Sequence, residues 1–227
     1  MNIPFYTATR EYKAHKDEFD AAVINVMEQG SFILGDEVNH FEKEAAEYLG
    51  VKYAIGVASG SDALVLGSDI LGFKNGAEVL TPTFTFFAST SCIARLGAKP
   101  VFVDVDPETL NIDLNDAARK VNKNTVGIIP VHLFTQPADM QRIMDLSRTY
   151  NLKVLEDAAE AWGMETKIDN VWKKAGTIGD IGIYSFFPTK TLGAYGDAGL
   201  MVTNDEELYK KIKSYRVHGS SVKYYHD

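Results

Sequence analysis

The sequence predicts an α/β fold in which helices cover both faces of a mostly parallel sheet of about seven strands. Two patterns predict it. From Tyr53 onward, short apolar segments alternate with segments whose apolar residues recur at helical spacing. None of the short apolar segments is followed by a tight Asn-Gly hairpin turn. Helical crossovers must then connect the strands, and such crossovers produce parallel sheets with both faces buried.

The individual elements follow from this alternation. Gly30 and Gly50 end the first two helices, as glycine commonly does. We expect helices at residues 17–29, 36–49, 59–71, 88–96, 114–121, 140–150 and 206–215. We expect strands at residues 53–57, 78–80, 101–105, 127–131, 153–157, 181–187 and 199–203. The remaining segments are an irregular N-terminal arm at 1–16, a polar excursion at 165–175 and a polar tail without helix or strand at 216–227; residues 17–227 form one large domain.

The composition argues against several classes of protein. With 23 Lys and Arg against 31 Asp and Glu, the chain carries a net charge of −8 and no basic nucleic-acid-binding surface. The single cysteine, Cys92, argues against a disulfide framework and against a cysteine metal site. The sequence has no N-terminal signal pattern and no run of about 18 apolar residues. We therefore expect a cytoplasmic protein without a bound metal and without a nucleic-acid or membrane partner.

One lysine stands in an unusual place. The apolar strand expected at 181–187 ends at Pro188, which cannot continue a central ladder, and Lys190 follows at once. Few other charges surround it, and three glycines come next along the chain. Desolvation lowers the pKa of a lysine, and a neutral amine is a nucleophile towards carbonyl groups. An isolated lysine in a loop would instead be an ordinary surface residue.

A carboxylate forms the second half of this pattern. Asp157 lies where the strand expected at 153–157 ends, and ligands bind at that edge of open α/β sheets. A lysine that forms a Schiff base, together with an aspartate facing a pyridinium nitrogen, is the constellation of a pyridoxal phosphate enzyme. By itself, Asp157 could equally cap a following helix.

Three motifs carry a family resemblance: residues 156–161, 185–190 and 192–197. Together they resemble the DegT/StrS-type sugar aminotransferases, which are fold-type I pyridoxal phosphate enzymes acting on nucleotide-linked keto sugars. The resemblance runs in order from about Phe32 to the end of the chain. It implies a three-layer large domain, with the family's small C-terminal domain missing from this chain.

The resemblance also assigns the cofactor site. The implied residues are Lys190, Asp157, Glu160, Ser185, Ser61, Asp62, Gly60 and Phe86. Ser185 and the turn before the 59–71 helix would hold the phosphate, although the turn is also explained as a plain capping box. Phe86 would lie on the cofactor ring, while Phe84 and Phe87 are expected in the core. Glu160 departs from the glutamine of many members, and a carboxylate beside the cofactor's phenolate is unfavourable unless one of them holds a proton.

Substrate contacts are less specific. The resemblance places Phe32, Ile33 and Leu34 near the substrate, but this segment could equally be a hydrophobic connector. The other implied substrate residues are His218 and Tyr224. His132 is expected as a hydrogen-bonded residue lining the site rather than as a general base. Asp104 and Asp106 are expected to be turn residues before Pro107 rather than metal ligands, because the sequence offers no third ligand near them.

The resemblance implies an amino transfer in two halves. Lys190 holds the cofactor and, once freed by an amino donor, moves a proton as general base and acid. Glutamate is the expected donor, and a nucleotide-linked keto sugar is the acceptor, as in amino-sugar and surface polysaccharide biosynthesis. The tail is slightly more similar to members acting on 3-keto UDP-N-acetyl sugars than to those acting on 4-keto-6-deoxy sugars. The alternative is a regulatory or sensor protein that binds pyridoxal phosphate without turnover.

The N-terminal third suggests self-association. Its apolar residues occur in segments too irregular to cover their own core: Phe5, Tyr6, Tyr12, Phe32, Ile33 and Leu34. Exposed apolar groups gathered in this way mark interfaces, and a two-fold dimer is the commonest closed assembly. The resemblance likewise implies a homodimer with active sites at the interface. A monomer whose arm packs on the missing C-terminal domain is the alternative.

Overall fold

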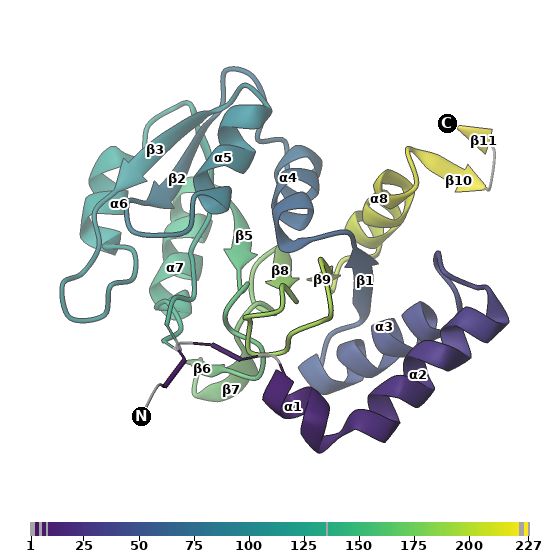
Figure 1. Cartoon of the computed structure of the whole chain (residues 1–227). Helices are drawn as coiled ribbons and strands as arrows, with labels where there is room; N and C mark the ends of the chain where they lie inside the picture. The colour runs from purple at the N-terminus through teal and green to yellow at the C-terminus, as the bar shows by residue number, and fades with distance from the viewer. Residues whose placement is uncertain (1–2, 5, 8, 135, 223–224, 227) are drawn as a thin grey trace.

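The computed structural model describes residues 3–4, 6–7, 9–134, 136–222 and 225–226, with side chains described up to residue 220. Phe5 and Tyr224 lie outside the described residues. A seven-stranded sheet forms the middle layer (Figure 1). Its strands lie in the order β1 (Tyr53–Val57), β9 (Gly199–Thr203), β8 (Ile181–Ser185), β5 (Lys153–Asp157), β4 (Thr125–Ile128), β2 (Glu78–Pro82) and β3 (Lys99–Val103). β9 runs in the direction opposite to the other six strands of this sheet. The predicted α/β fold with a mostly parallel sheet is therefore confirmed.

Helices cover both faces of the sheet. One face carries α4 (Gly60–Ile70), α5 (Ala88–Arg95) and α8 (Glu206–Arg216), and the other carries α3 (Asp36–Leu49), α6 (Leu114–Lys120) and α7 (Met140–Tyr150). Successive strand residues point to opposite faces. Accordingly, Ile55 belongs to the same hydrophobic cluster as Leu64 of α4, whereas Ala54 belongs to that of Ala45 on α3. This two-sided burial explains why the strands are nearly continuous apolar runs.

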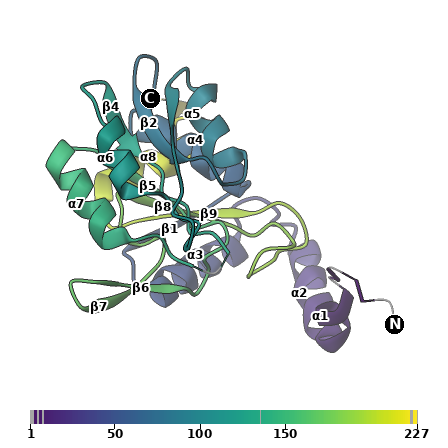
Figure 2. The same ribbon diagram turned by 90° about the vertical axis from the view of Figure 1, so that its left-hand side faces the viewer.

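The N-terminal helices stand apart from these layers. Figure 2 shows α1 (Thr9–Ala14) and α2 (Lys16–Gln29) extending away from the body of the molecule. Neither helix has a buried residue. The Tyr12 hydroxyl donates to Asp20 at 2.8 Å, which ties α1 to α2. The expectation of an irregular arm is therefore wrong for Thr9–Ala14, a helix too short to display an apolar period.

The polar excursion is a hairpin. Strands β6 (Glu165–Ile168) and β7 (Val171–Lys174) pair antiparallel outside the main sheet. Asp169 and Asn170, the two residues between them, both have positive φ angles, 48° and 65°. Two-residue loops of this kind match the twist of the flanking strands. The sequence analysis described this segment only as a polar excursion, because Asp169-Asn170 replaces the glycine-containing turn that usually indicates a hairpin.

The end of the chain also differs from the prediction. Two short strands, β10 (Ser220–Val222) and β11 (Tyr225–His226), pair antiparallel where a tail without strands was expected. His218 and Gly219, just before β10, both adopt positive φ angles and end α8. Strands of three and two residues are too short to leave a periodicity that can be recognised in a sequence.

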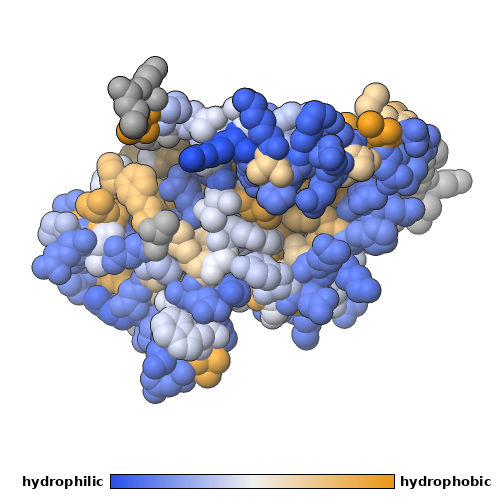
Figure 3. Space-filling model, turned by 60° about the horizontal axis from the view of Figure 1, so that its bottom comes forward, coloured by the Kyte–Doolittle hydropathy of each residue, from blue (hydrophilic) through white to orange (hydrophobic). Residues whose placement is uncertain are grey.

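The surface and the interior show where the polar groups lie. Figure 3 presents the lower face, where hydrophobic residues form separate patches among hydrophilic ones. Among the helices of the described segments, none combines the length and apolarity needed to span a bilayer.

Cys92 is buried in α5, and burial raises the pKa of its thiol to about 11. Asp106 accepts hydrogen bonds from the backbone N–H groups of Thr109 and Glu108, which lower its pKa, so its predicted role as a turn residue is confirmed.

Candidate active site

A cavity of about 450 Å³ opens at the carboxyl ends of the parallel strands. Ligands bind at this edge in open α/β sheets. The residues lining the cavity are Ser59, Gly60, Ser61, Leu64, Thr85, Phe86, Ala88, Val131, His132, Leu133, Asp157, Ala159, Glu160, Ser185, Phe187, Thr189, Lys190 and Asp197. The segments that contribute these residues are far apart in the sequence. They include Asp157 and Ser185, the last residues of β5 and β8.

Asp157 is the buried carboxylate of the cavity. Its Oδ2 accepts a hydrogen bond from Ser89 Oγ at 2.6 Å, and its Oδ1 accepts one from the Ala159 N–H at 3.1 Å. Ser89 in turn lies 2.8 Å from Thr85 Oγ1. Burial raises the pKa of Asp157, while the hydrogen bonds from Ser89 and Ala159 act in the opposite direction and lower it. Within the described residues, Ser89 and Ala159 are the donors to this buried carboxylate, which is therefore well placed to take a cationic partner from the cavity.

Lys190 and Glu160 form an ion pair in the same cavity. Lys190 Nζ lies 2.9 Å from Glu160 Oε1, with 20% of the lysine and 34% of the glutamate side chain exposed. The backbone N–H of Lys190 donates to Phe187 O at 2.8 Å, which closes a tight turn directly after β8. Glu160 comes from the turn that follows β5. The family resemblance placed Glu160 beside the phenolic oxygen of the cofactor. No sequence pattern predicted the contact between Glu160 and Lys190.

The N-terminus of α4 forms another wall. Ser59 caps the helix, because its Oγ accepts a hydrogen bond from the Asp62 N–H at 3.0 Å. Gly60 permits a close approach to β8, since a Cβ on it would lie 2.7 Å from Ser185 Cβ. Gly60, Ser61 and Ser185 thus line the cavity together. Asp62 does not line it, and its N–H is already used by the cap.

The phenylalanines before α5 are more exposed than expected. Phe86 lines the cavity, in agreement with its predicted location. Phe84 and Phe87 are 46% and 76% exposed, so the prediction that they belong to the core is wrong. Phe84 makes an edge contact with Phe134, whose ring centroid is 6.0 Å away. A cluster of aromatic residues in sequence does not reveal which of them faces the interior.

Those predicted substrate residues that the structure describes do not line this cavity. Phe32, Ile33 and Leu34 connect α2 to α3, and all three are exposed. His218 follows α8 and does not line the cavity either. Thr189 and Asp197 do line it, although no role was predicted for them. No group of three or more potential metal-binding side chains occurs within the described residues.

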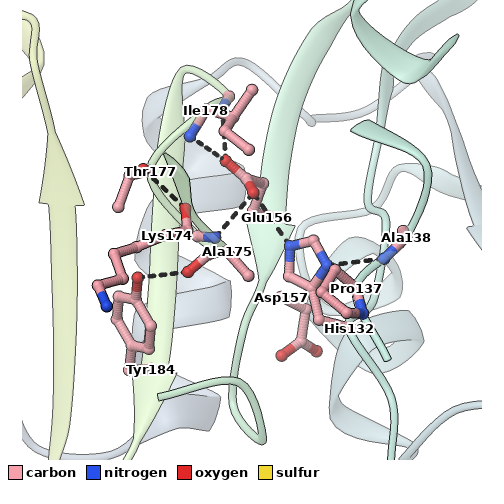
Figure 4. Close-up of polar contacts among 12 residues, drawn as sticks. His132, Pro137, Ala138, Glu156, Asp157, Lys174, Ala175, Thr177, Ile178 and Tyr184 are labelled. Atoms are coloured by element: carbon pink, nitrogen blue, oxygen red, sulfur yellow. Dashed lines mark hydrogen bonds and ion pairs between the residues drawn. The ribbon is translucent and has the colours of Figure 1, made fainter. Parts of the chain in front are cut away.

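His132 and Glu156 form a buried pair beside Asp157, and Glu156 is the residue that precedes Asp157 on β5 (Figure 4). Glu156 Oε2 lies 3.0 Å from His132 Nε2 and also accepts the Gly176 N–H at 2.9 Å. Its Oε1 accepts the N–H groups of Ile178 and Gly179. The expectation that His132 is hydrogen-bonded and lines the site is confirmed. Glu156 had no predicted role, although a carboxylate within an apolar strand requires buried donors.

Known proteins resemble this chain closely. The DegT/DnrJ/EryC1/StrS aminotransferase family matches residues 13–227. The chain is 46% identical over 226 residues to a pleiotropic regulatory protein of Geobacillus stearothermophilus. It is 41% identical over 225 residues to a UDP-N-acetyl-3-dehydro-alpha-D-glucosamine 3-aminotransferase of Acidithiobacillus ferrooxidans. These alignments cover 100% and 99% of this chain and 60% of each relative, so the chain spans less than two thirds of their length.

A solved structure shares the fold. NtdA from Bacillus subtilis, with bound cofactor PMP, matches with a TM-score of 0.92 and 32% sequence identity. The match covers 100% of this chain and 51% of the NtdA chain. The sequence match and the fold agree, and this chain therefore belongs to the DegT/DnrJ/EryC1/StrS aminotransferase family.

Proposed function

We propose that the complete protein is a pyridoxal phosphate-dependent aminotransferase that moves an amino group from glutamate to a nucleotide-linked keto sugar. The observation that carries the proposal is the presence of Lys190 and Asp157 in one cavity at the carboxyl edge of the sheet. The names of the aminotransferase relatives and the PMP bound in NtdA support the reaction class and the cofactor.

The residues of the cavity fit this cofactor. Asp157 would face the pyridine nitrogen, because its buried carboxylate lines the cavity and, in the part of the chain that the structure describes, accepts hydrogen bonds only from Ser89 and Ala159. Ser185 and the start of α4 at Gly60 and Ser61 would hold the phosphate with hydroxyl and N–H donors. Phe86 would cover the ring. When bound, pyridoxal phosphate supplies an aldehyde for amines and a ring that accepts electrons from the α-carbon.

Lys190 performs the proton transfer in this proposal. Its amine removes the proton from the α-carbon of the amino donor and serves as both base and acid. The 2.9 Å contact with Glu160 gives that carboxylate a cationic partner. Asp157 stabilises positive charge on the opposite side of the cavity.

The relatives support a sugar acceptor. The Acidithiobacillus relative is named for a UDP-linked 3-dehydro amino sugar, and another relative, from Streptomyces venezuelae, for a dTDP-linked trideoxy sugar. The identity to the first is 41% and to the second 35%. Both names place the amino group on C3 of the sugar, so we favour a 3-keto sugar over a 4-keto-6-deoxy sugar, as a step in amino-sugar synthesis. The higher identity to the Acidithiobacillus relative favours a UDP-linked N-acetyl sugar.

A second function is a regulator that binds the cofactor without turnover. The name of the Geobacillus relative, at 46% identity, favours it. Lys190 and Asp157 lie together in the cavity and support the enzyme instead. The two functions differ in whether the bound cofactor reacts with an amino donor.

Purified complete protein tests this difference. Loaded with pyridoxal phosphate, it should show a cofactor absorbance band that shifts when glutamate is added. Product analysis by mass spectrometry should then show an amino sugar from a UDP-linked 3-keto N-acetyl sugar, and less product from a dTDP-linked 4-keto-6-deoxy sugar. A band that glutamate leaves unchanged would support the regulator, and protein without a band would exclude both functions.

Asp157→Asn should reduce turnover much more than cofactor binding. The charge of Asp157 acts mainly on the electron-rich state that develops during the reaction, so we expect kcat to fall about 10²- to 10³-fold. The Kd for pyridoxal phosphate should rise by about tenfold or less. Steady-state kinetics at saturating cofactor measure the first value and absorbance titration the second. Turnover close to that of the unmodified protein would refute the proposed role of Asp157.

We further propose an isologous homodimer. The helix α2 has no buried residue, and its apolar residues Val23, Ile24 and Met27 are 53%, 53% and 65% exposed. Phe32 and Ile33, which follow the helix in sequence, are also exposed apolar residues. A second copy of the chain would cover these residues, and obligate dimers bury more than about 2,000 Å².

Sedimentation equilibrium of the complete protein at micromolar concentration should give twice the monomer mass. Met27→Glu should shift the protein towards the monomer, because it places a charge in the proposed interface. Glu28→Ala, on the same helix, provides the control and should leave the mass unchanged. A stable, cofactor-loaded monomer would refute the dimer.

A further inference from the structure

Two consecutive residues of β5, Glu156 and Asp157, carry carboxylates that point in opposite directions (Figure 4). Their exposures are 0% and 4%. Asp157 faces the cavity, whereas Glu156 faces the segment that follows β7. Burial of two adjacent carboxylates requires that each be compensated separately, because like charges oppose each other. The proposed function uses only Asp157.

Glu156 is compensated by four donors. Three are backbone N–H groups, of which Gly176 donates at 2.9 Å and Ile178 at 2.6 Å, with Gly179 as the third. The fourth is His132 Nε2, at 3.0 Å. The other ring nitrogen, Nδ1, accepts the Ala138 N–H at 3.0 Å. Because Nδ1 accepts a hydrogen bond, the ring hydrogen lies on Nε2, which donates to the Glu156 carboxylate.

His132 reaches Asp157 through its own backbone. The N–H of His132 donates to Asp157 O at 3.0 Å, and the N–H of Asp157 donates to Pro130 O at 2.9 Å. Residues 130–132 thus continue the parallel pairing of β4 and β5 up to Asp157. The ring of His132 anchors the same short segment to Glu156 and to Ala138. The His132 side chain therefore fixes residues 130–132, the segment that makes backbone hydrogen bonds to Asp157.

We propose that His132 is a positioning residue for Asp157, with Glu156 as the fixed point against which its ring is held. The pair orients the Asp157 carboxylate towards the cationic part of a bound cofactor. The inference rests on the proposed function, because it takes pyridoxal phosphate as the ligand that Asp157 meets. A merely structural role would instead stabilise the fold without acting through Asp157.

The test measures the Kd for pyridoxal phosphate in the complete protein by absorbance titration. His132→Phe keeps the ring volume and removes both ring hydrogen bonds. We expect it to raise the Kd about tenfold, because a charge-assisted contact of Asp157 loses its alignment. His132→Gln restores a donor towards Glu156 and should return the Kd to within about twofold. In the Asp157→Asn background, His132→Phe should change the Kd by less than about twofold.

Tyr184→Phe is the matched control. Tyr184 is 1% exposed, and its hydroxyl donates to Ala175 O at 2.6 Å within the same buried region (Figure 4). This substitution removes a buried hydrogen bond that does not involve residues 130–132. It should lower the melting temperature while leaving the Kd within about twofold in both backgrounds. An equal effect of Tyr184→Phe and His132→Phe on the Kd would overturn the proposal.

Other outcomes are equally decisive. If His132→Phe raises the Kd by the same factor with and without Asp157, the residue acts independently of Asp157 and the inference is wrong. If His132→Phe does not fold, Glu156→Gln provides the same comparison between the two backgrounds, with the same expected loss and the same refutation. Failure of the unmodified protein to bind pyridoxal phosphate would refute the proposed function itself, which distinguishes the two failures.

Discussion

The structure depends on the burial of two adjacent carboxylates at the end of a central strand. Glu156 is stabilised by three backbone N–H groups and the ring of His132, so its charge is matched within the protein. Among the described residues, Asp157 has only Ser89 and Ala159 as donors, and burial raises its pKa. An ionised carboxylate in the interior requires compensation. The uncompensated side of Asp157 is the side that faces the cavity.

The fold supplies the rest of the cavity at the same edge. Parallel strands end together, so residues far apart in the sequence converge there. β8 delivers Ser185 and, after a tight turn, Lys190. Gly60 lets the N-terminus of α4 approach β8 closely, which brings backbone donors towards Ser185. The cavity therefore brings together the lysine Lys190, the buried carboxylate of Asp157 and the residues Gly60, Ser61 and Ser185.

The fold was largely predictable because burial on both faces leaves a strong pattern. Helix 36–49 and strand 53–57 have the predicted bounds, and Asp157 and Lys190 do lie in one cavity. Local features were less predictable. The Asp169-Asn170 hairpin lacks the usual glycine, and α1 is too short to show an apolar period. The exposure of Phe84 and the contact between Glu160 and Lys190 depend on tertiary packing, which residue types alone do not encode.

The central claim is that Lys190 forms the covalent link to pyridoxal phosphate. Borohydride reduction of the loaded complete protein, followed by proteolysis and mass spectrometry, tests it directly. Lys174 is an internal control, since it is 23% exposed against 20% for Lys190 and also pairs with a glutamate, Glu165, at 3.0 Å. The account predicts a pyridoxyl adduct on Lys190 and none on Lys174. An adduct on another lysine with Lys190 unmodified would contradict it.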